Sequence, residues 1–309
     1  MTVLRKWYSR REGMMDLLDV ASLTKDYGNG RGLFNFSMQL NAGDIVGLIG
    51  VNGAGKTTLL NMLAGCIHAD SGKICYEGEE VTMDSPCRKK FGISVEPNFY
   101  EYLTAYENLE SILYLNGIRR AEEMNNEIKR VLNTVGLEGV EKKKIKEFSF
   151  GMKQRLGFAQ ALLNAQTVLL LDEPFVGLDI HGRGMVKSLI QEMAKKQKMA
   201  VIFSDHNLDE VKSLCNRLIV IRDGVKHYDG DIHIQSAVML NVDDTDKIDS
   251  RYARKLDQHR LVITEENMNE KLHYISSIAT ILSVEKVINP LEKLLEEGND
   301  EDAYTVRAI

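Results

Sequence analysis

The chain has 309 residues, which is enough for one sizeable core and a smaller second unit, because single cores rarely grow past about 250–300 residues. It is 44% hydrophobic and 27% charged, as is typical of a globular protein, and its net charge of −6 argues against nucleic acid as the main partner. No apolar run reaches the roughly 18 residues that a membrane helix needs. The composition therefore favours neither a secreted chain nor one that spans a membrane by itself.

The chain begins with a basic segment, residues 1–15, that has no apolar stretch behind it. Contact with anionic lipid is one interpretation of this charge. We instead expect a disordered leader, or an extension upstream of a start at Met14 or Met15. The basic side chains are Arg5, Lys6, Arg10 and Arg11.

Strand-like apolar segments alternate with helical patterns up to residue 230, which predicts an α/β domain over residues 16–230. From about residue 99 to residue 164 the pattern is helical, and Thr104 and Glu107 have the spacing of a capping box at a helix start. We therefore expect a helical insertion at 99–164 within the sheet domain. The predicted strands are 17–23, 33–40, 45–49, 73–76, 167–171, 199–204 and 217–221.

Residues 231–309 carry none of the chemical motifs described below. Residues 260–264 have strand character, and apolar residues at helical spacing follow them. We predict a small C-terminal α/β accessory domain, whose role is open between dimer stabilisation, regulation and partner binding. The apolar positions at helical spacing are Met268, Leu272, Ile275 and Ala279.

The cysteines show no C-x-x-C spacing and lie in apolar settings. We expect buried free thiols in a reducing cytoplasm, rather than disulfides or a zinc site. These residues are Cys66, Cys75, Cys87 and Cys215.

The most informative motif runs from Gly50 to Thr58 and fits the phosphate-binding pattern G-x-x-x-x-G-K-[ST]. Its glycines allow backbone N–H groups to surround a phosphate, and the following helix adds its positive dipole end. Lys56 then reaches the β- and γ-phosphates, and the Thr57 hydroxyl binds Mg²⁺. The predicted nucleotide-binding residues of this loop are Asn52, Gly53, Ala54, Gly55, Lys56, Thr57 and Thr58.

A second motif, residues 167–174, is an apolar strand that ends in Asp172 and Glu173. Where a strand ends the chain turns, so two adjacent carboxylates can take separate tasks. Asp172 is placed to hold Mg²⁺, as acids at this strand end do in phosphate-loop enzymes. Glu173 is then free to orient the attacking water or to accept its proton. The two carboxylates predict hydrolysis of a nucleoside triphosphate.

Residues 16–230 resemble the ATP-binding subunits of ABC transporters. Residues 148–152, Phe-Ser-Phe-Gly-Met, are similar to the family's signature Leu-Ser-Gly-Gly-Gln in the serine and the second glycine. Ser149 and Gly151 open a predicted helix at 152–164, so a hydroxyl, backbone N–H groups and a helix dipole form a second anion site. The fold class that the resemblance implies is a phosphate-loop NTPase of the ABC ATPase type.

The resemblance also assigns roles to residues outside these motifs. Tyr27 lies at the family's distance before the phosphate loop for the aromatic side chain that stacks on adenine. Asp179 belongs to the sequence Gly-Leu-Asp at 177–179, which is similar to the family's D-loop and contributes to nucleotide binding. His206 stands where the family has its sensor of the γ-phosphate, and is therefore expected to act in catalysis with Glu173.

Two positions depart from the family pattern. Phe150 replaces the first glycine of the signature, and Val95 stands where the family usually has a glutamine that links Mg²⁺ to the membrane partner. Either the adjacent Glu96 substitutes through a water-mediated contact to Mg²⁺, or this coupling is weakened. Met152, followed by Gln-Arg-Leu at 154–156, is similar to the branch that exports peptide antibiotics, lantibiotics or drugs.

The resemblance implies an ATP-hydrolysing subunit that uses ATP and Mg²⁺ and powers transport, in this branch export. Two copies of the chain are expected to face head to tail, with each ATP between the phosphate loop of one copy and the signature of the other. A separate integral membrane subunit would receive the motion. The chain would then be a peripheral protein on the cytoplasmic face of the cell membrane.

Other functions of a phosphate loop fit the sequence less well. A soluble ABC-type switch on nucleic acid or a translation complex usually carries two ATPase domains or a long coiled coil, and the sequence has neither. A small-molecule kinase would leave the signature and His206 unexplained. A GTPase would be expected to carry Asn-Lys-x-Asp for guanine, which is absent from the sequence.

Overall fold

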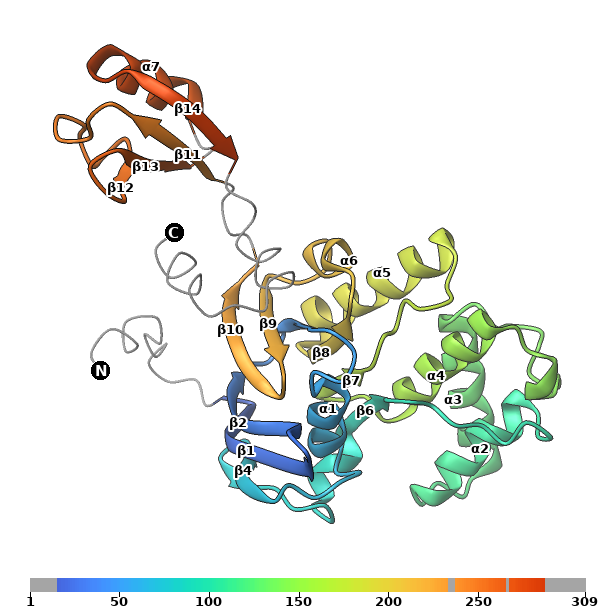
Figure 1. Cartoon of the computed structure of the whole chain (residues 1–309). Helices are drawn as coiled ribbons and strands as arrows, with labels where there is room; N and C mark the ends of the chain where they lie inside the picture. Colours follow the sequence, from blue (N-terminus) through green and yellow to red (C-terminus); the bar gives the residue numbers. More distant parts are fainter. Residues whose placement is uncertain (1–15, 233–236, 265–266, 287–309) are drawn as a thin grey trace. The chain divides into compact units, whose positions relative to one another are not determined.

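The computed structural model describes residues 16–232, 237–264 and 267–286. The chain divides into two compact units, Met1–Gly230 and Asp231–Ile309, and each has a hydrophobic core of its own (Figure 1). The leader expected at residues 1–15 lies outside the described residues.

The first unit contains two β-sheets. The larger consists of β3 (Ile45–Ile49), β6 (Phe91–Ser94), β7 (Val168–Leu171), β8 (Ala200–Asp205), β9 (Arg217–Arg222) and β10 (Val225–Asp231). Its order is β10-β9-β3-β8-β7-β6, and β3 pairs in parallel with both β8 and β9. The smaller, antiparallel sheet has the order β2-β1-β4-β5 and consists of β1 (Leu18–Gly28), β2 (Arg31–Leu40), β4 (Ser71–Tyr76) and β5 (Glu79–Glu80).

The central strands of the larger sheet are buried along their whole length. Every residue of β3, β7 and β8 is buried, and most of these residues are Val, Ile or Leu. Parallel strands that are covered on both faces need such continuous apolar runs. The apolar sequences of these strands therefore place the sheet in the interior. The polar residues lie at the carboxyl ends of the strands.

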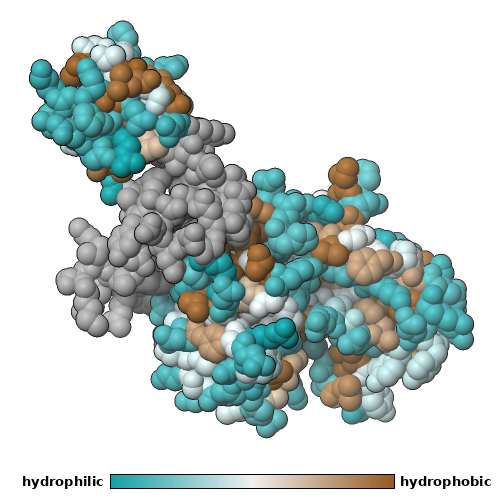
Figure 2. Space-filling model, in the orientation of Figure 1, coloured by the Kyte–Doolittle hydropathy of each residue, from teal (hydrophilic) through white to brown (hydrophobic). Residues whose placement is uncertain are grey.

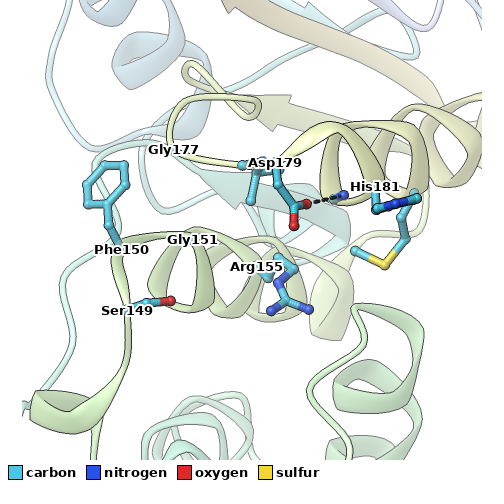
Figure 3. Close-up of a pocket in the computed structure, with 10 residues that line it drawn as sticks. Ser149, Phe150, Gly151, Arg155, Gly177, Asp179 and His181 are labelled. Carbon is cyan, nitrogen blue, oxygen red and sulfur yellow. Dashed lines mark hydrogen bonds between the residues drawn. The ribbon is translucent and has the colours of Figure 1, made fainter.

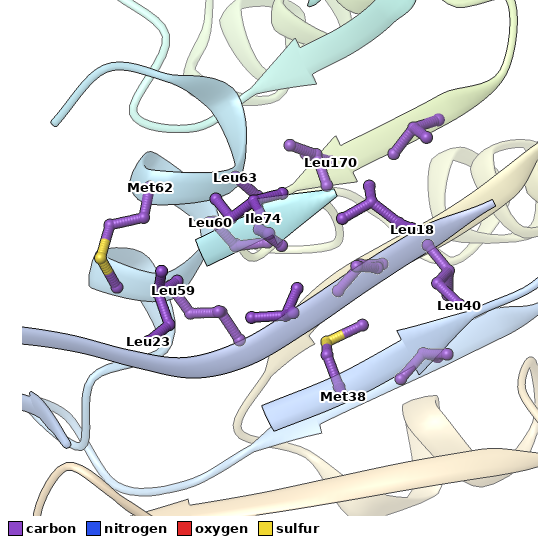
Figure 4. Packing of buried hydrophobic residues seen from close by; sticks show 14 of the residues in the cluster. Leu18, Leu23, Met38, Leu40, Leu59, Leu60, Met62, Leu63, Ile74 and Leu170 are labelled. Atoms are coloured by element: carbon purple, nitrogen blue, oxygen red, sulfur yellow. The ribbon is translucent and has the colours of Figure 1, made fainter. Parts of the chain in front are cut away.

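Helix α1 (Lys56–Ala64) belongs to one core together with residues of both sheets. Figure 4 shows Leu59, Leu60 and Leu63 of α1 near Ile74 of β4 and Leu170 of β7. Two further helices, α5 (Ile180–Gln197) and α6 (Leu208–Lys212), follow β7 and β8 along the chain and pack against β8.

The predicted helical insertion consists of α2 (Ala105–Leu115), α3 (Ala121–Thr134) and α4 (Phe150–Asn164), which lie together at one side of the sheets in Figure 1. The predicted capping box is present, since the Thr104 hydroxyl accepts from the Glu107 N–H at 3.1 Å and Glu107 accepts from the Thr104 N–H at 2.7 Å. Helix α4 packs on β6 and so connects the insertion to the sheet. Short 3₁₀ turns occur at Pro86–Lys90 and Ile145–Glu147.

The second unit is a four-stranded sheet with one described helix. Its elements are β11 (Ala237–Val242), β12 (Arg254–Lys255), β13 (Arg260–Thr264), α7 (Met268–Ile278) and β14 (Ile281–Lys286). The order is β12-β13-β11-β14, with antiparallel pairs. Val238, Leu240 and Val242 alternate into a core that also contains Ile275 of α7. The strand at 260–264 and the helix after it were predicted, whereas the other strands were not.

The prediction about the cysteines is partly wrong. All of them are free thiols, as expected, and Cys215 is buried. Cys66 is exposed, and Cys75 and Cys87 are half-buried. Cys66 directly follows the cap residue Gly65, where α1 has ended at the surface, so its apolar sequence neighbours do not enclose it.

Within the described parts of the chain, no helix combines the length and the apolar character needed to cross a membrane. On the face shown in Figure 2, apolar residues of the first unit occur in small groups between hydrophilic ones.

Candidate nucleotide site

The phosphate loop connects β3 to α1 and leaves the first turn of that helix open. Gly53 and Gly55 have φ values of +82° and +108°, which side chains other than glycine rarely adopt. Gly55 is the N-cap residue of α1, and it has no side chain to accept from the first N–H groups. These donors and the helix dipole therefore face the loop and are suited to a phosphate.

Lys56 is buried inside this loop. Its Nζ donates to the main-chain oxygens of Gly50, at 2.6 Å, and Val51, at 3.2 Å. Burial lowers the pKa of Lys56, and the nearby carboxylates of Glu173, Asp172 and Asp205 oppose that shift. The ammonium group is therefore held at the loop with acidic groups close to it.

Thr57 and Asp172 are joined directly, although they are far apart in the sequence. The Thr57 Oγ1 donates to Oδ2 of Asp172 at 2.7 Å, and Ser204 of β8 donates to Oδ1 of the same carboxylate. The contacts form because β3, β8 and β7 are parallel neighbours, so their carboxyl ends meet at one edge of the sheet.

This edge supplies the ligands that Mg²⁺ prefers, a hydroxyl and a carboxylate. Among the residues that the structure describes, no group of three or more His, Cys, Asp or Glu side chains could hold a metal ion alone. Mg²⁺ in nucleotide sites usually has only one or two protein carboxylates as ligands and takes the rest from phosphates and water. Thr57 and Asp172 therefore fit a magnesium ion that arrives with a nucleotide.

Glu173 lies beside this pair in a left-handed backbone conformation, with φ of +46°. Its N–H donates to Ser204 Oγ at 2.9 Å, and its main-chain oxygen accepts from Gln154 Nε2 at 3.0 Å. One carboxylate oxygen is 3.7 Å from His206 Nδ1. The structure thus brings the predicted base and the predicted sensor side by side.

His206 also faces a second carboxylate. Its Nδ1 is 3.8 Å from Oδ1 of Asp205, a residue that is 2% exposed. Burial raises the pKa of Asp205, and hydrogen bonds from the N–H groups of Asn207 and His206 oppose the shift. The imidazole of His206 therefore has a buried carboxyl group, that of Asp205, beside its Nδ1.

The predicted second anion site lies at the N-terminus of α4. Ser149 is the N-cap residue and accepts from the Met152 N–H at 3.2 Å. Figure 3 shows Gly151 facing the turn that carries Asp179, with Ser149 at the start of the helix. Asp179 caps α5 by accepting from the Gly182 N–H at 2.7 Å. These residues line a cavity of about 660 Å³. The predicted signature and D-loop residues therefore line one cavity.

Phe150, the departure from the signature, packs on the turn before α5. Figure 3 shows its ring below Gly177, where an added Cβ would lie 2.0 Å from Cδ1 of the ring. Residue 177 must therefore be glycine for the ring to keep this position. The Phe150 ring therefore packs on the turn that contains Gly177, and it lines the same cavity as Ser149 and Gly151.

Tyr27 and Glu96 lie on other segments. Tyr27 is exposed near the end of β1, with the Nζ of Lys25 5.9 Å from its ring centroid. Glu96 is exposed two residues after β6 and has φ of +45°. Among the described contacts, none joins either side chain to the group around Asp172.

Two residues of the site were missed by the sequence reasoning. In the sequence, Ser204 was recognised only as the last residue of the predicted strand 199–204, and Gln154 only as part of the Gln-Arg-Leu motif. Ser204 ends up beside Asp172 because β7 and β8 are paired, and Gln154 reaches Glu173 from a helix. These contacts depend on which strands and helices are neighbours in the fold. They could be predicted from the sequence only if the order of the strands were already known.

A strand, a phosphate loop, a helix and an acidic strand end thus define a nucleotide-binding ATPase fold. The family model described as ABC transporter matches residues 33–176. The lantibiotic transport ATP-binding protein SrtF of Streptococcus pyogenes is 36% identical over 223 residues, which are 71% of this chain and 94% of SrtF. The bacitracin transport ATP-binding protein BcrA of Bacillus licheniformis is 39% identical over 213 residues, 68% of each chain.

A solved structure agrees with these relatives. That of cbiO1 from Clostridium perfringens, described as part of the ABC transporter complex cbiONQ, has a TM-score of 0.60 at 26% identity and covers 71% of this chain and 90% of its own. The chain belongs to the ABC transporter ATP-binding proteins. The predicted fold class, the function as an ATP-binding transporter subunit and the resemblance to the antibiotic-transport branch are confirmed.

Proposed function

We propose that this subunit hydrolyses ATP at the edge formed by β3, β7 and β8. The observation that carries the proposal is the continuous contact from Thr57 through Asp172 and Ser204 to Glu173. Lys56 binds the β- and γ-phosphates, and Thr57 and Asp172 hold Mg²⁺, which when bound supplies positive charge to the phosphate oxygens. Glu173 accepts the proton of the attacking water, and His206 beside it contacts the γ-phosphate.

The remaining site residues complete the binding of ATP under this proposal. The loop residues Asn52 to Gly55 and Thr58 surround the phosphates, and Tyr27 stacks on adenine from its exposed position. Glu96 contacts Mg²⁺ through water in place of the usual glutamine. Ser149, Gly151 and Asp179 contact the ATP that is bound by a second copy.

The dimer follows from two anion-binding surfaces in one subunit. The phosphate loop and the N-terminus of α4 are both suited to phosphate, and a head-to-tail pair of copies lets them meet across each ATP. The γ-phosphate contacts the second copy only in the closed pair, so ATP closes the dimer and hydrolysis reopens it.

A membrane subunit would receive this motion on the segment between β6 and α2. Tyr100 and Tyr102 are 58% and 68% exposed there, and their ring centroids lie 5.9 Å apart. The side chain of Asn108 bonds both the N–H and the main-chain oxygen of Tyr100, which fixes the loop. Exposed aromatic side chains on a fixed loop favour a protein partner. The subunit would then be peripheral, on the cytoplasmic face of the membrane.

The transported substrate and the domain roles are part of the same proposal. The names of SrtF and BcrA refer to lantibiotic and bacitracin transport and favour a peptide antibiotic, a lantibiotic or a related drug as the substrate. We propose export as the direction of transport. We assign the ATPase function to residues 16–230. Because 94% of SrtF is matched within about seven-tenths of this chain, we assign an accessory role to residues 231–309.

The Glu173→Gln variant tests the catalytic assignment. Removing the carboxylate while keeping its shape should lower ATP turnover by about a hundredfold or more, because proton transfer typically contributes 10²–10⁴-fold. ATP should still bind and should hold the variant as a dimer, measured by size-exclusion chromatography with light scattering. Lys56→Ala serves as the contrast, since it should lose ATP binding as well. Retained hydrolysis in Glu173→Gln would remove Glu173 as the base.

Isolation of the tagged Glu173→Gln chain from host membranes in Mg-ATP tests the transporter partner. A stoichiometric membrane protein with several spanning helices, identified by mass spectrometry, is the expected result. Recovery with ribosomes or DNA and without such a protein would contradict the proposal.

A further inference from the structure

Gln154 contacts the main chain of Glu173 from another element. Its Nε2 donates to the Glu173 main-chain oxygen at 3.0 Å, in a partly buried setting. Gln154 lies in the first half of α4, the helix that Ser149 caps. A single side chain therefore joins the N-terminal part of the signature helix to the residue proposed as the base.

Glu173 needs to be held because its backbone is strained. Residues other than glycine rarely adopt the left-handed conformation that Glu173 has, so the surroundings must impose it. The Ser204 hydroxyl accepts from the N–H of Glu173 at 2.9 Å. The oxygen of Glu173 accepts from Gln154 and, at 3.2 Å, from the Val176 N–H. Residues of β8 and α4 thus hold the strained residue from two sides.

The same end of α4 packs on the turn that follows Glu173. The Phe150 ring lies on Gly177, and a Cβ on Gly151 would be 2.9 Å from the Gly177 oxygen. The start of α4 and the segment 173–177 are therefore closely packed. Gln154 adds the hydrogen bond that reaches Glu173 itself.

We propose that Gln154 is a positioning residue for hydrolysis, which holds the main chain of Glu173 so that its carboxylate faces the attacking water. The inference rests on the proposed function, in which Glu173 is the base for its own subunit's ATP while Ser149 contacts the second copy's ATP. Gln154 then links the helix that senses one nucleotide to the base that acts on the other.

The Gln154→Leu variant of the full chain removes the donor at similar volume. The maximal ATPase rate should fall about ten- to a hundredfold with little change in KM, as expected when a reacting group is misplaced. ATP binding and closure do not need the bond, so the variant should accumulate as a dimer in Mg-ATP, as Glu173→Gln should. Gln197→Leu is the matched control, because Gln197 is exposed at the end of α5 and should keep full activity.

Two contrasts separate positioning from general damage. Ser149→Ala removes a group that would contact ATP, so its dimer fraction and its rate should fall together. Gln154→Glu places an acceptor against the Glu173 oxygen and should lose at least as much rate as Gln154→Leu.

An unchanged rate in Gln154→Leu would overturn the inference. A joint fall in rate, dimer fraction and melting temperature would also overturn it, because that is the result of a purely structural role. Absence of ATPase activity in the parent chain, or of an ATP-dependent dimer in Glu173→Gln, would instead remove the proposed function and the inference together.

Discussion

Asp205 and Cys215 are buried titratable groups, and each has consequences at the scale of a single residue. Asp205 is the buried last residue of β8, and burial raises its pKa. Cys215 is enclosed below β3, where burial raises the pKa of its thiol to about 12. Neither group is needed as a ligand in the proposed mechanism, so both can be tested apart from catalysis.

The Asp205→Asn variant should change how stability depends on pH. Because the folded-state pKa of Asp205 lies above its ordinary value of 3.8, the stability that its neutral form contributes is complete below pH 3.8. That contribution is lost as the pH rises through the folded-state value. The free energy of unfolding in urea, measured for the parent and the variant from about pH 4 to 8, should therefore move in the variant's favour as the pH rises. If the difference in the free energy of unfolding between parent and variant stayed constant with pH, the raised pKa of Asp205 would be contradicted.

The two extreme cysteines should differ strongly in alkylation. Cys66 is exposed, whereas the thiol of Cys215, with a pKa of about 12, is ionised in only about one molecule in ten thousand at pH 8. Iodoacetamide should therefore label Cys66 within minutes and leave Cys215 unmodified in the native chain, as followed by peptide mass spectrometry. In urea both should react, which is the control. Equal labelling of the native chain would mean that the β3 region opens readily.

At the scale of elements, short caps and long-range pairings have different sequence signals. The capping box of α2 was predicted from Thr104 and Glu107 alone, because its contacts lie within one helical turn. The sequence predicted that Thr57 and Asp172 both hold Mg²⁺, but it did not predict the hydrogen bond between them. That bond depends on which strands are neighbours in the sheet.

Thr104→Ala should destabilise the first unit by about 1 kcal/mol, because it leaves the Glu107 N–H of α2 without its side-chain acceptor. A loss of this size lowers the melting temperature of a domain of this length by roughly 2–4 °C. Thr104→Ser keeps the hydroxyl and should retain most of the stability. Equal losses in both variants would point to the methyl group of Thr104 instead of the cap.

The missed strands show where sequence patterns fail. Strand β6 has only four residues, one of them glycine, and it forms because Phe91 pairs with Val168 far along the chain. Strand β10 is polar and carries no periodic apolar signal. The continuously apolar strands β3, β7 and β8 and the phosphate loop were predictable because each carries its whole signal locally. Gln154 and Ser204 were not, because their partners come from other elements.

At the scale of the whole molecule, the two units have separate cores, and a change in one core should stay within its unit. Leu240 is fully buried among residues 238–281 of the second unit. Leu240→Ala should cost that unit about 2–5 kcal/mol. Hydrogen exchange, followed by mass spectrometry, should accelerate in β11 and β13 and remain unchanged in β3, with ATP binding retained. Faster exchange in β3 would mean that the two units unfold as one.

The position of β3 between β8 and β9 also governs how the chain can be made. Its neighbours β8 and β9 are synthesised about 155 and 170 residues later, and parallel pairing over such separations is slow. Until β9, which ends at Arg222, has been synthesised, β3 lacks one of its two neighbours and the phosphate loop lacks its complete sheet. Nucleotide therefore cannot assist folding before β8 and β9 have joined β3, because the site that binds it forms only in the completed sheet.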